Sequence, residues 1–137
     1  MKIETEFELE FINRFVVKNK RERLIGFASK PKSRNKMFNE FRSPEIFDPR
    51  YVTEILGSDR NTDILANIYK KHGMSGRVYV MSENEEWDAQ RFQMSYIVDE
   101  CMAMCIDTIG YCWKSKTAFY EWHHSGASYF LKCNDKT

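Results

Sequence analysis

Residues 106–132 constrain the fold of this chain more than any other stretch. Residues 108–113 and 117–123 are rich in aromatic and β-branched side chains, which favour β-strands, and the three polar residues between them suffice for a hairpin loop. A second turn is expected around Gly126, which can adopt a positive φ, and residues 128–132 then return as a third strand. The stretch therefore predicts a three-stranded antiparallel meander.

Alternation along residues 117–124 indicates which side of this sheet faces the core. Ala118, Tyr120 and Trp122 share one face, and this is the more apolar of the two. Phe119 lies on the other face with polar neighbours. We therefore expect the helices to pack on the face that carries Tyr120.

The N-terminal half predicts helices. Phe7, Phe11 and Phe15 recur at i, i+4 and i+8, which gives one apolar stripe on a helix over residues 4–17. Apolar residues at helical spacing, together with Ser-Pro and Asp-Pro starts, predict further helices near residues 24–29, 32–41, 48–57 and 59–72. A fourth strand is expected at residues 77–81, and the apolar spacing over residues 90–106 predicts one more amphipathic helix.

These elements together predict the α+β class. We expect a single domain over residues 1–137, with residues 1–76 mainly helical and residues 77–133 forming a strand, a helix and the meander. The helical N-terminal half would pack on one face of a mostly antiparallel four-stranded sheet. A chain of 137 residues can bury a core without disulfide or metal support, and its 15% aromatic content supplies the rings to fill that core.

The chain is expected to be cytoplasmic. Residues 1–10 have neither the basic region nor the apolar region of a signal peptide, and no run reaches the roughly 18 apolar residues of a membrane span. We therefore expect no membrane partner. In a reducing compartment the cysteines should be thiols rather than disulfides; they are Cys101, Cys105, Cys112 and Cys133.

Cysteine and histidine gather in the C-terminal third, where they could serve a metal or a catalytic pair. Cys101 and Cys105 lie on the predicted core stripe, and their spacing from Cys112 fits no zinc finger or knuckle, so packing is the favoured role. Cys112 could pair with His123 as thiolate and base, but no helix N-terminus or oxyanion loop activates it. No catalytic fingerprint occurs elsewhere. We therefore predict no metal, no cofactor and no catalytic residue.

Charge is distributed unevenly along the chain. Residues 14–50 contain eleven Lys or Arg against four acids, a local net charge of +7, and residues 83–107 contain seven acids against Arg91 alone, a local net charge of −6. The basic segment, with its interleaved phenylalanines, could bind nucleic acid, and its candidate residues are Lys20, Arg21, Arg23, Lys32, Arg34 and Lys36. The favoured alternative is that the basic helices face the acidic loop and helix within the fold.

The acidic loop at residues 82–88 holds an isolated tryptophan. An exposed Trp beside charged residues is typical of the centre of a protein interface, so we predict a partner-binding set of Trp87, Glu85, Glu86, Asp88 and Trp113. The alternative is that Trp87 folds back over the sheet as a lid.

The sequence therefore predicts a protein-interaction module without catalytic activity. By analogy of size and lack of motif, it would be a regulatory or inhibitor protein of the toxin-immunity kind, with another protein as its partner. Nucleic-acid binding through residues 14–50 is the first alternative. A small enzyme that uses the region of Cys112 and His123 is the second. The sequence specifies no oligomeric state.

Overall fold

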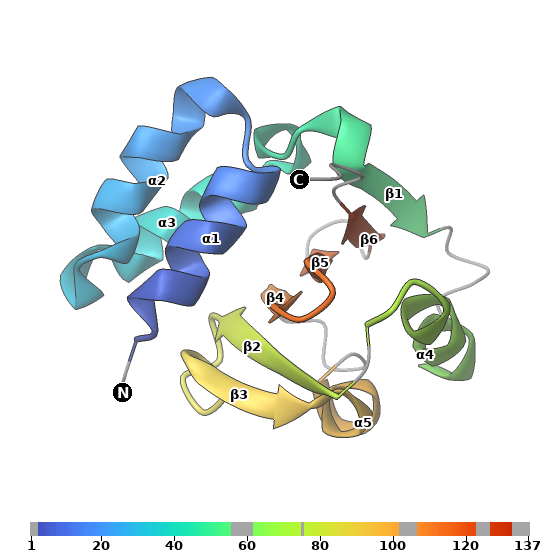
Figure 1. Ribbon diagram of the computed structural model, residues 1–137. Helices are drawn as coiled ribbons and strands as arrows, with labels where there is room; N and C mark the ends of the chain where they lie inside the picture. Colours follow the sequence, from blue (N-terminus) through green and yellow to red (C-terminus); the bar gives the residue numbers. More distant parts are fainter. Residues whose placement is uncertain (1–2, 56–61, 75, 102–106, 123–126, 133–137) are drawn as a thin grey trace.

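A computed structural model describes residues 3–55, 62–74, 76–101, 107–122 and 127–132 of the chain (Figure 1). Within this part the protein is α+β and carries an antiparallel six-stranded sheet in the order β1-β6-β5-β4-β2-β3. The strands are β1 (Val52–Ile55), β2 (Arg77–Ser82), β3 (Gln90–Gln93), β4 (Thr108–Cys112), β5 (Thr117–Trp122) and β6 (Ala127–Lys132).

Helices come before β1, between β1 and β2, and after β3 in the sequence. The helices are α1 (Thr5–Phe15), α2 (Arg21–Ala28), α3 (Arg34–Phe41), α4 (Thr62–Lys71), α5 (Met94–Tyr96) and the π-helical segment η6 (Ile97–Cys101) that continues α5. Short 3-10 turns join them, namely η1 (Lys18–Lys20), η2 (Pro31–Ser33), η3 (Pro44–Ile46) and η4 (Pro49–Tyr51). Among the described residues, none of the helices has the length and apolar character needed to cross a membrane.

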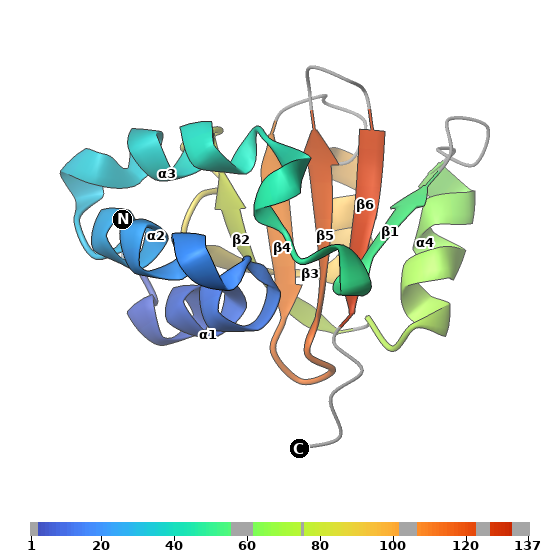
Figure 2. The same cartoon turned by 90° about the horizontal axis from the view of Figure 1, so that it is seen from above.

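The predicted meander is present as β4, β5 and β6, which lie side by side in Figure 2. Its register opposes Gly110 to Phe119 and Phe119 to Phe130. A Cβ atom on Gly110 would lie 2.1 Å from Cε1 of Phe119, so this glycine makes room for the neighbouring ring. The predicted fourth strand is also present, as β2, and it pairs with β4.

The expected number of strands was too low because two edge strands, β1 and β3, were not predicted. Residues 48–57 were expected to be helical, but the proline turn that Asp48 caps lasts only through Tyr51, and Val52–Ile55 then pairs with β6. The β-branched side chains of this strand favour pairing once β6 offers an open edge. Residues 90–93, expected to be helical, pair with β2 instead, so that the helix begins at Met94.

Helices cover both faces of the sheet rather than one. In Figure 1, α1, α2 and α3 lie on one side of the strands and α4 and α5 on the other. Tyr79, Tyr111 and Tyr120 pack in the cluster under α1–α3, whereas Phe119 and Phe130 pack in a second cluster with residues of α4 and η6. Phe119 is 0% exposed, so the face that we expected to be the less buried one is also a core face.

Candidate functional site

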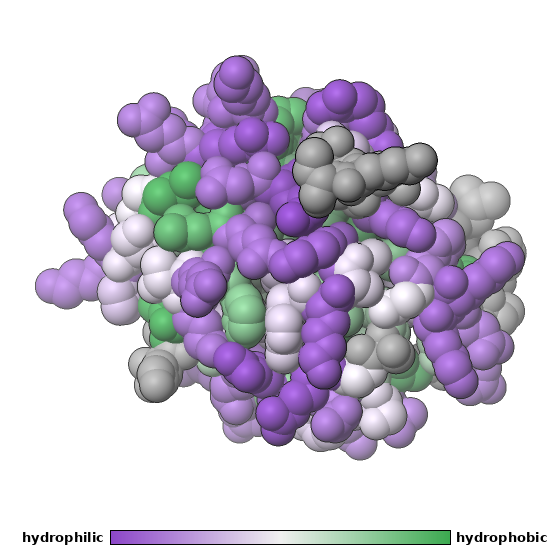
Figure 3. Space-filling model, in the orientation of Figure 1, coloured by the Kyte–Doolittle hydropathy of each residue, from purple (hydrophilic) through white to green (hydrophobic). Residues whose placement is uncertain are grey.

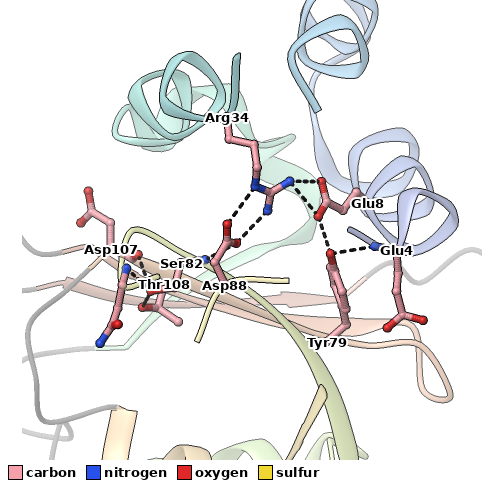
Figure 4. Close-up of polar contacts among 9 residues, drawn as sticks. Glu4, Glu8, Arg34, Tyr79, Ser82, Asp88, Asp107 and Thr108 are labelled. Carbon is pink, nitrogen blue, oxygen red and sulfur yellow. Dashed lines mark hydrogen bonds and ion pairs between the residues drawn. The ribbon is translucent and has the colours of Figure 1, made fainter. Parts of the chain in front are cut away.

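A buried cluster of charged side chains joins α1, α3 and the turn between β2 and β3 (Figure 4). Arg34 of α3 donates from Nε and Nη2 to the Asp88 carboxylate at 2.8 and 2.7 Å, and from Nη1 to both oxygens of Glu8 at 2.8 and 3.0 Å. Arg34 is 3% exposed and Glu8 is 0% exposed. One guanidinium therefore bridges two carboxylates from distant parts of the chain away from water.

The carboxylates of this cluster have further donors. The Tyr79 hydroxyl donates to Oε2 of Glu8 at 2.5 Å and accepts from the backbone N–H of Glu4 at 3.2 Å. The backbone N–H of Ser82 donates to Oδ1 of Asp88 at 3.1 Å. Because these groups satisfy one another, the cluster can remain buried without the penalty of an isolated charge.

Burial dominates the electrostatics of the cluster. It raises the pKa of Glu8, and the opposing effect of Arg34 does not fully cancel it. Burial, followed by the neighbouring Glu8 charge, also raises the pKa of Tyr79. For Arg34, burial alone would lower the pKa, but hydrogen bonds to Asp88 and Glu8 raise it above its ordinary value. Arg34 and Tyr79 therefore retain their protons and act as hydrogen-bond donors within the cluster.

A second arginine of the same segment extends this link to the acidic turn. Arg42, which follows α3, donates to Glu83 at 2.5 Å and to Asp107 at 3.3 Å. Together, Arg34 and Arg42 hold the acidic turn that contains Glu83 and Asp88 alongside α3. The basic and acidic segments of the sequence thus meet within the fold at these two arginines.

The predicted partner-binding residues differ in exposure and in the side of the sheet on which they pack. Trp87 is only 7% exposed and packs in the cluster on the α4 side of the sheet, whereas Asp88 lies in the charged cluster on the other side. Glu85 and Glu86 are exposed. Trp113 is half-buried, stacks on Phe7 with 4.7 Å between ring centroids, and lies 4.9 Å from the Arg91 guanidinium.

The predicted nucleic-acid-binding residues also separate into groups. Arg34 is buried, and half-buried Arg21 donates from Nε to the Val16 carbonyl at 2.9 Å. Arg23 is exposed, pairs with Glu40 at 2.8 Å and lies over the Phe27 ring at 5.4 Å. The remaining candidates are exposed, namely Lys20, Lys32 and Lys36.

Exposed side chains of both signs therefore remain on the basic segment and on the acidic turn that Arg34 and Arg42 hold beside α3. We call this set of exposed side chains the charged face and define it by Lys20, Arg23, Lys32, Lys36, Glu85 and Glu86. The Nζ atom of Lys36 lies 5.9 Å from the centre of the half-buried Phe27 ring, on which Arg23 also lies. Figure 3 shows hydrophilic side chains over most of the face in view, with a small apolar area near α2.

The cysteine and histidine candidates have no exposed member in the described structure. Cys112 is 1% exposed and packs in the core cluster on the α4 side. His123, Cys105, Cys133 and the side chain of Cys101 lie outside the described residues. Within the described ranges, no three His, Cys, Asp or Glu side chains are grouped so that they could hold a metal ion.

Sequence reasoning missed Glu8 and Tyr79 as members of the charged cluster. A signal for Glu8 was present, because it lies three, four and seven residues before Phe11, Ile12 and Phe15 and therefore on the apolar stripe of its helix. An acid in that position requires a buried partner. No comparable signal marked Tyr79, whose hydroxyl reaches the cluster only because β2 lies beneath α1.

Comparison with known proteins adds no relative, because no protein-family model, curated protein or solved structure matches this chain.

Proposed function

We propose that this protein is a non-catalytic interaction module of the regulatory or inhibitor type, with the cytoplasm as its expected compartment and another protein as its partner. The charged face is the proposed binding surface. The observation that carries this proposal is the pairing of Arg34 with Asp88 and of Arg42 with Glu83. These pairs hold the acidic turn beside α3, and we infer from them that the exposed lysines of the basic segment and the exposed glutamates of the turn act together as one binding surface.

A surface with both signs of charge favours a protein partner over nucleic acid. A protein can present acids to Lys32 and Lys36 and bases to Glu85 and Glu86, which makes the contact selective and accelerates association. A nucleic-acid backbone carries negative charge alone, so the glutamates would repel it. The half-buried ring of Phe27, between Arg23 and Lys36, offers an aromatic contact of the kind that interface centres use.

Affinity capture with matched charge reversals tests the proposal. Wild-type protein, K32E/K36E and K71E/K132E would be used as baits in lysate from the source cells, with quantitative mass spectrometry of what each retains. The control variant reverses two exposed lysines outside the charged face. We expect a partner that wild type and K71E/K132E retain equally and that K32E/K36E binds roughly thirtyfold more weakly, because two reversed contacts at about 1 kcal/mol each remove about 2 kcal/mol of binding free energy.

Two results would contradict this proposal. One is a partner that K32E/K36E retains as well as wild type does, because binding would then not use the charged face. The other is salt-sensitive retention of RNA or DNA in a filter-binding assay that K32E/K36E abolishes, which would favour the nucleic-acid alternative through the same lysines. The enzymatic alternative gains no support from Cys112, which lies in the core.

A further inference from the structure

The strand β3 lies at one edge of the sheet and pairs with β2 alone among the described strands. Met94, directly after β3, continues this ladder by donating its backbone N–H to the Gly76 carbonyl at 2.7 Å. Because the backbone groups of successive residues in a strand point to opposite sides, the N–H and C=O groups of Arg91 and Gln93 point away from β2. These two residues therefore offer donors and acceptors to a further strand.

The charged side chain of β3 is drawn back over its own sheet. Charged side chains on an edge strand normally discourage pairing with another chain. Arg91, however, donates to both carboxylate oxygens of Glu4 at 2.8 and 2.6 Å. Its guanidinium lies 5.0 Å from the Phe7 ring centre and 4.9 Å from that of Trp113, which follows β4 on the far side of β2. The charge therefore points away from the open edge, whereas β1 at the opposite edge carries the exposed Glu54.

An aromatic pair lies beside the same edge, on the face of the sheet that bears α5 (Figure 1). The half-buried Phe92 ring stacks on Tyr96 of α5, with 4.9 Å between the ring centroids. Tyr96 is 41% exposed, and no other large hydrophobic side chain in the described ranges is exposed. Aromatic side chains are enriched at the centres of protein interfaces, so this pair indicates that a partner covers the edge.

A second copy of this chain fits the edge in one register. With a two-fold axis at Phe92, two antiparallel β3 strands let Arg91 of each copy exchange backbone hydrogen bonds with Gln93 of the other. Each Phe92 ring then lies opposite its symmetry mate in a closely spaced pair, where aromatic pairs stabilise sheets. An axis at Arg91 would oppose like charges, and an axis at Gln93 would place Arg91 against α5 of the second copy.

We propose that this protein forms a symmetric dimer through β3, in which the two six-stranded sheets join into one continuous sheet. Main-chain hydrogen bonds between Arg91 and Gln93 hold the two copies together, and the paired Phe92 and Tyr96 rings cover each other on the α5 side. This interface is separate from the charged face, because it contains none of the residues that define that surface.

Sedimentation equilibrium of the purified full chain tests this proposal. As its concentration rises from about 10 μM to about 1 mM, wild type should change from a monomer of 16.4 kDa to twice that mass. Q93P removes the outward N–H and should dimerise roughly thirtyfold more weakly, because both symmetric hydrogen bonds that Gln93 donates are lost. The matched control Q93A keeps this N–H and should dimerise as wild type does.

The Q93P variant should keep the fold of the monomer. Gln93 has a φ of −68°, close to the value that proline fixes, and its N–H does not point toward β2. Amide hydrogen exchange by NMR gives a second measurement on the unaltered chain. The backbone amides of Arg91 and Gln93 should exchange more slowly as the protein concentration rises, whereas the exchange of amides in the charged face should not change.

Three results would overturn the proposal. They are a wild-type monomer at every concentration, Q93P that dimerises as tightly as Q93A, and exchange at Arg91 and Gln93 that does not depend on concentration. If Q93P fails to fold, the hydrogen exchange of the wild type still decides. These measurements need no partner protein, and K32E/K36E should dimerise as wild type does, so the outcome is independent of the proposed function.

Discussion

Arg34 and Asp88, which are 54 residues apart in the sequence, form a two-bond ion pair inside the protein, with 2.8 Å from Nε to Oδ2 and 2.7 Å from Nη2 to Oδ1. The same guanidinium also holds Glu8, so that α1, α3 and the β2–β3 turn converge on one side chain. The buried network therefore fixes where the acidic turn lies relative to the basic helices.

Replacement of Arg34 by methionine should destabilise the fold strongly. R34M leaves the carboxylates of Glu8 and Asp88 buried without their cation, and a broken buried pair costs about 3–5 kcal/mol. The matched control is R23M, which removes the exposed pair with Glu40 and should cost no more than about 1 kcal/mol. Urea unfolding of both variants gives the two free energies of unfolding. If R34M and R23M lower the free energy of unfolding by the same amount, the buried Arg34 network contributes no more to stability than an exposed ion pair does.

Addition of one methyl group at Gly110 should also be costly. The new Cβ of G110A would lie 2.1 Å from Cε1 of Phe119 in a packed core, and such overpacking costs about 1–3 kcal/mol or more. At Gly26 of α2 a new Cβ would meet nothing within 4 Å, so G26A should stabilise by roughly 0.5–1 kcal/mol through higher helix propensity. Thermal unfolding checks both predictions: the melting temperature should fall for G110A and rise for G26A.

A double variant locates the cause of the Gly110 effect. If the Phe119 ring is the obstacle, G110A should cost much less in an F119A background than in wild type, because the two positions share one space. Additive losses would instead assign the effect to the backbone of β4.

Glu10 should make stability depend on pH. Burial tends to raise the pKa of this carboxyl, but hydrogen bonds from Lys116 and Tyr111 outweigh burial and lower the pKa below its ordinary value of 4.5. The ionised form therefore stabilises the folded state above about pH 4.5, and this contribution is lost as the pH falls through the lowered pKa. E10Q should be less stable than wild type at pH 7 and approach it near pH 2. The check is urea unfolding of both proteins across this range.

The control for this pH dependence is E6Q, which removes an exposed carboxylate from the same helix. From pH 7 to pH 2, the difference in the free energy of unfolding between wild type and E10Q should decrease more than the difference between wild type and E6Q. If the difference in the free energy of unfolding between wild type and E10Q stays constant from pH 7 to pH 2, the hydrogen bonds from Lys116 and Tyr111 do not stabilise the ionised Glu10 carboxylate.

Fluorescence quenching should distinguish two of the tryptophans. Trp87 is 7% exposed, whereas Trp113 is half-buried under Arg91, so acrylamide should quench Trp113 more strongly. W113F/W122F retains only Trp87, and W87F/W122F retains only Trp113. In denaturant both variants should show the same Stern–Volmer constant. Strong quenching of Trp87 in the folded protein would contradict its burial and would support the prediction that it is an exposed contact for a partner.

The sequence predicted those elements whose identity is local. The phenylalanine stripe of α1, the strand β2 and the meander from β4 to β6 each follow from the periodicity of a few neighbouring residues, and the structure contains all of them. The α+β class and the antiparallel pairing follow from the same patterns.

Tertiary structure alone decided the remaining features. The strands β1 and β3 exist because β6 and β2 have open edges, which the local sequence does not reveal. Phe119 is buried because α4 and η6 cover the second face of the sheet. Arg34 and Asp88 looked like residues of two separate surface sites, and their burial against each other depends on a contact across 54 residues. Local patterns determine secondary structure, but the choice between an exposed charge and a buried ion pair depends on partners that only the complete fold brings together.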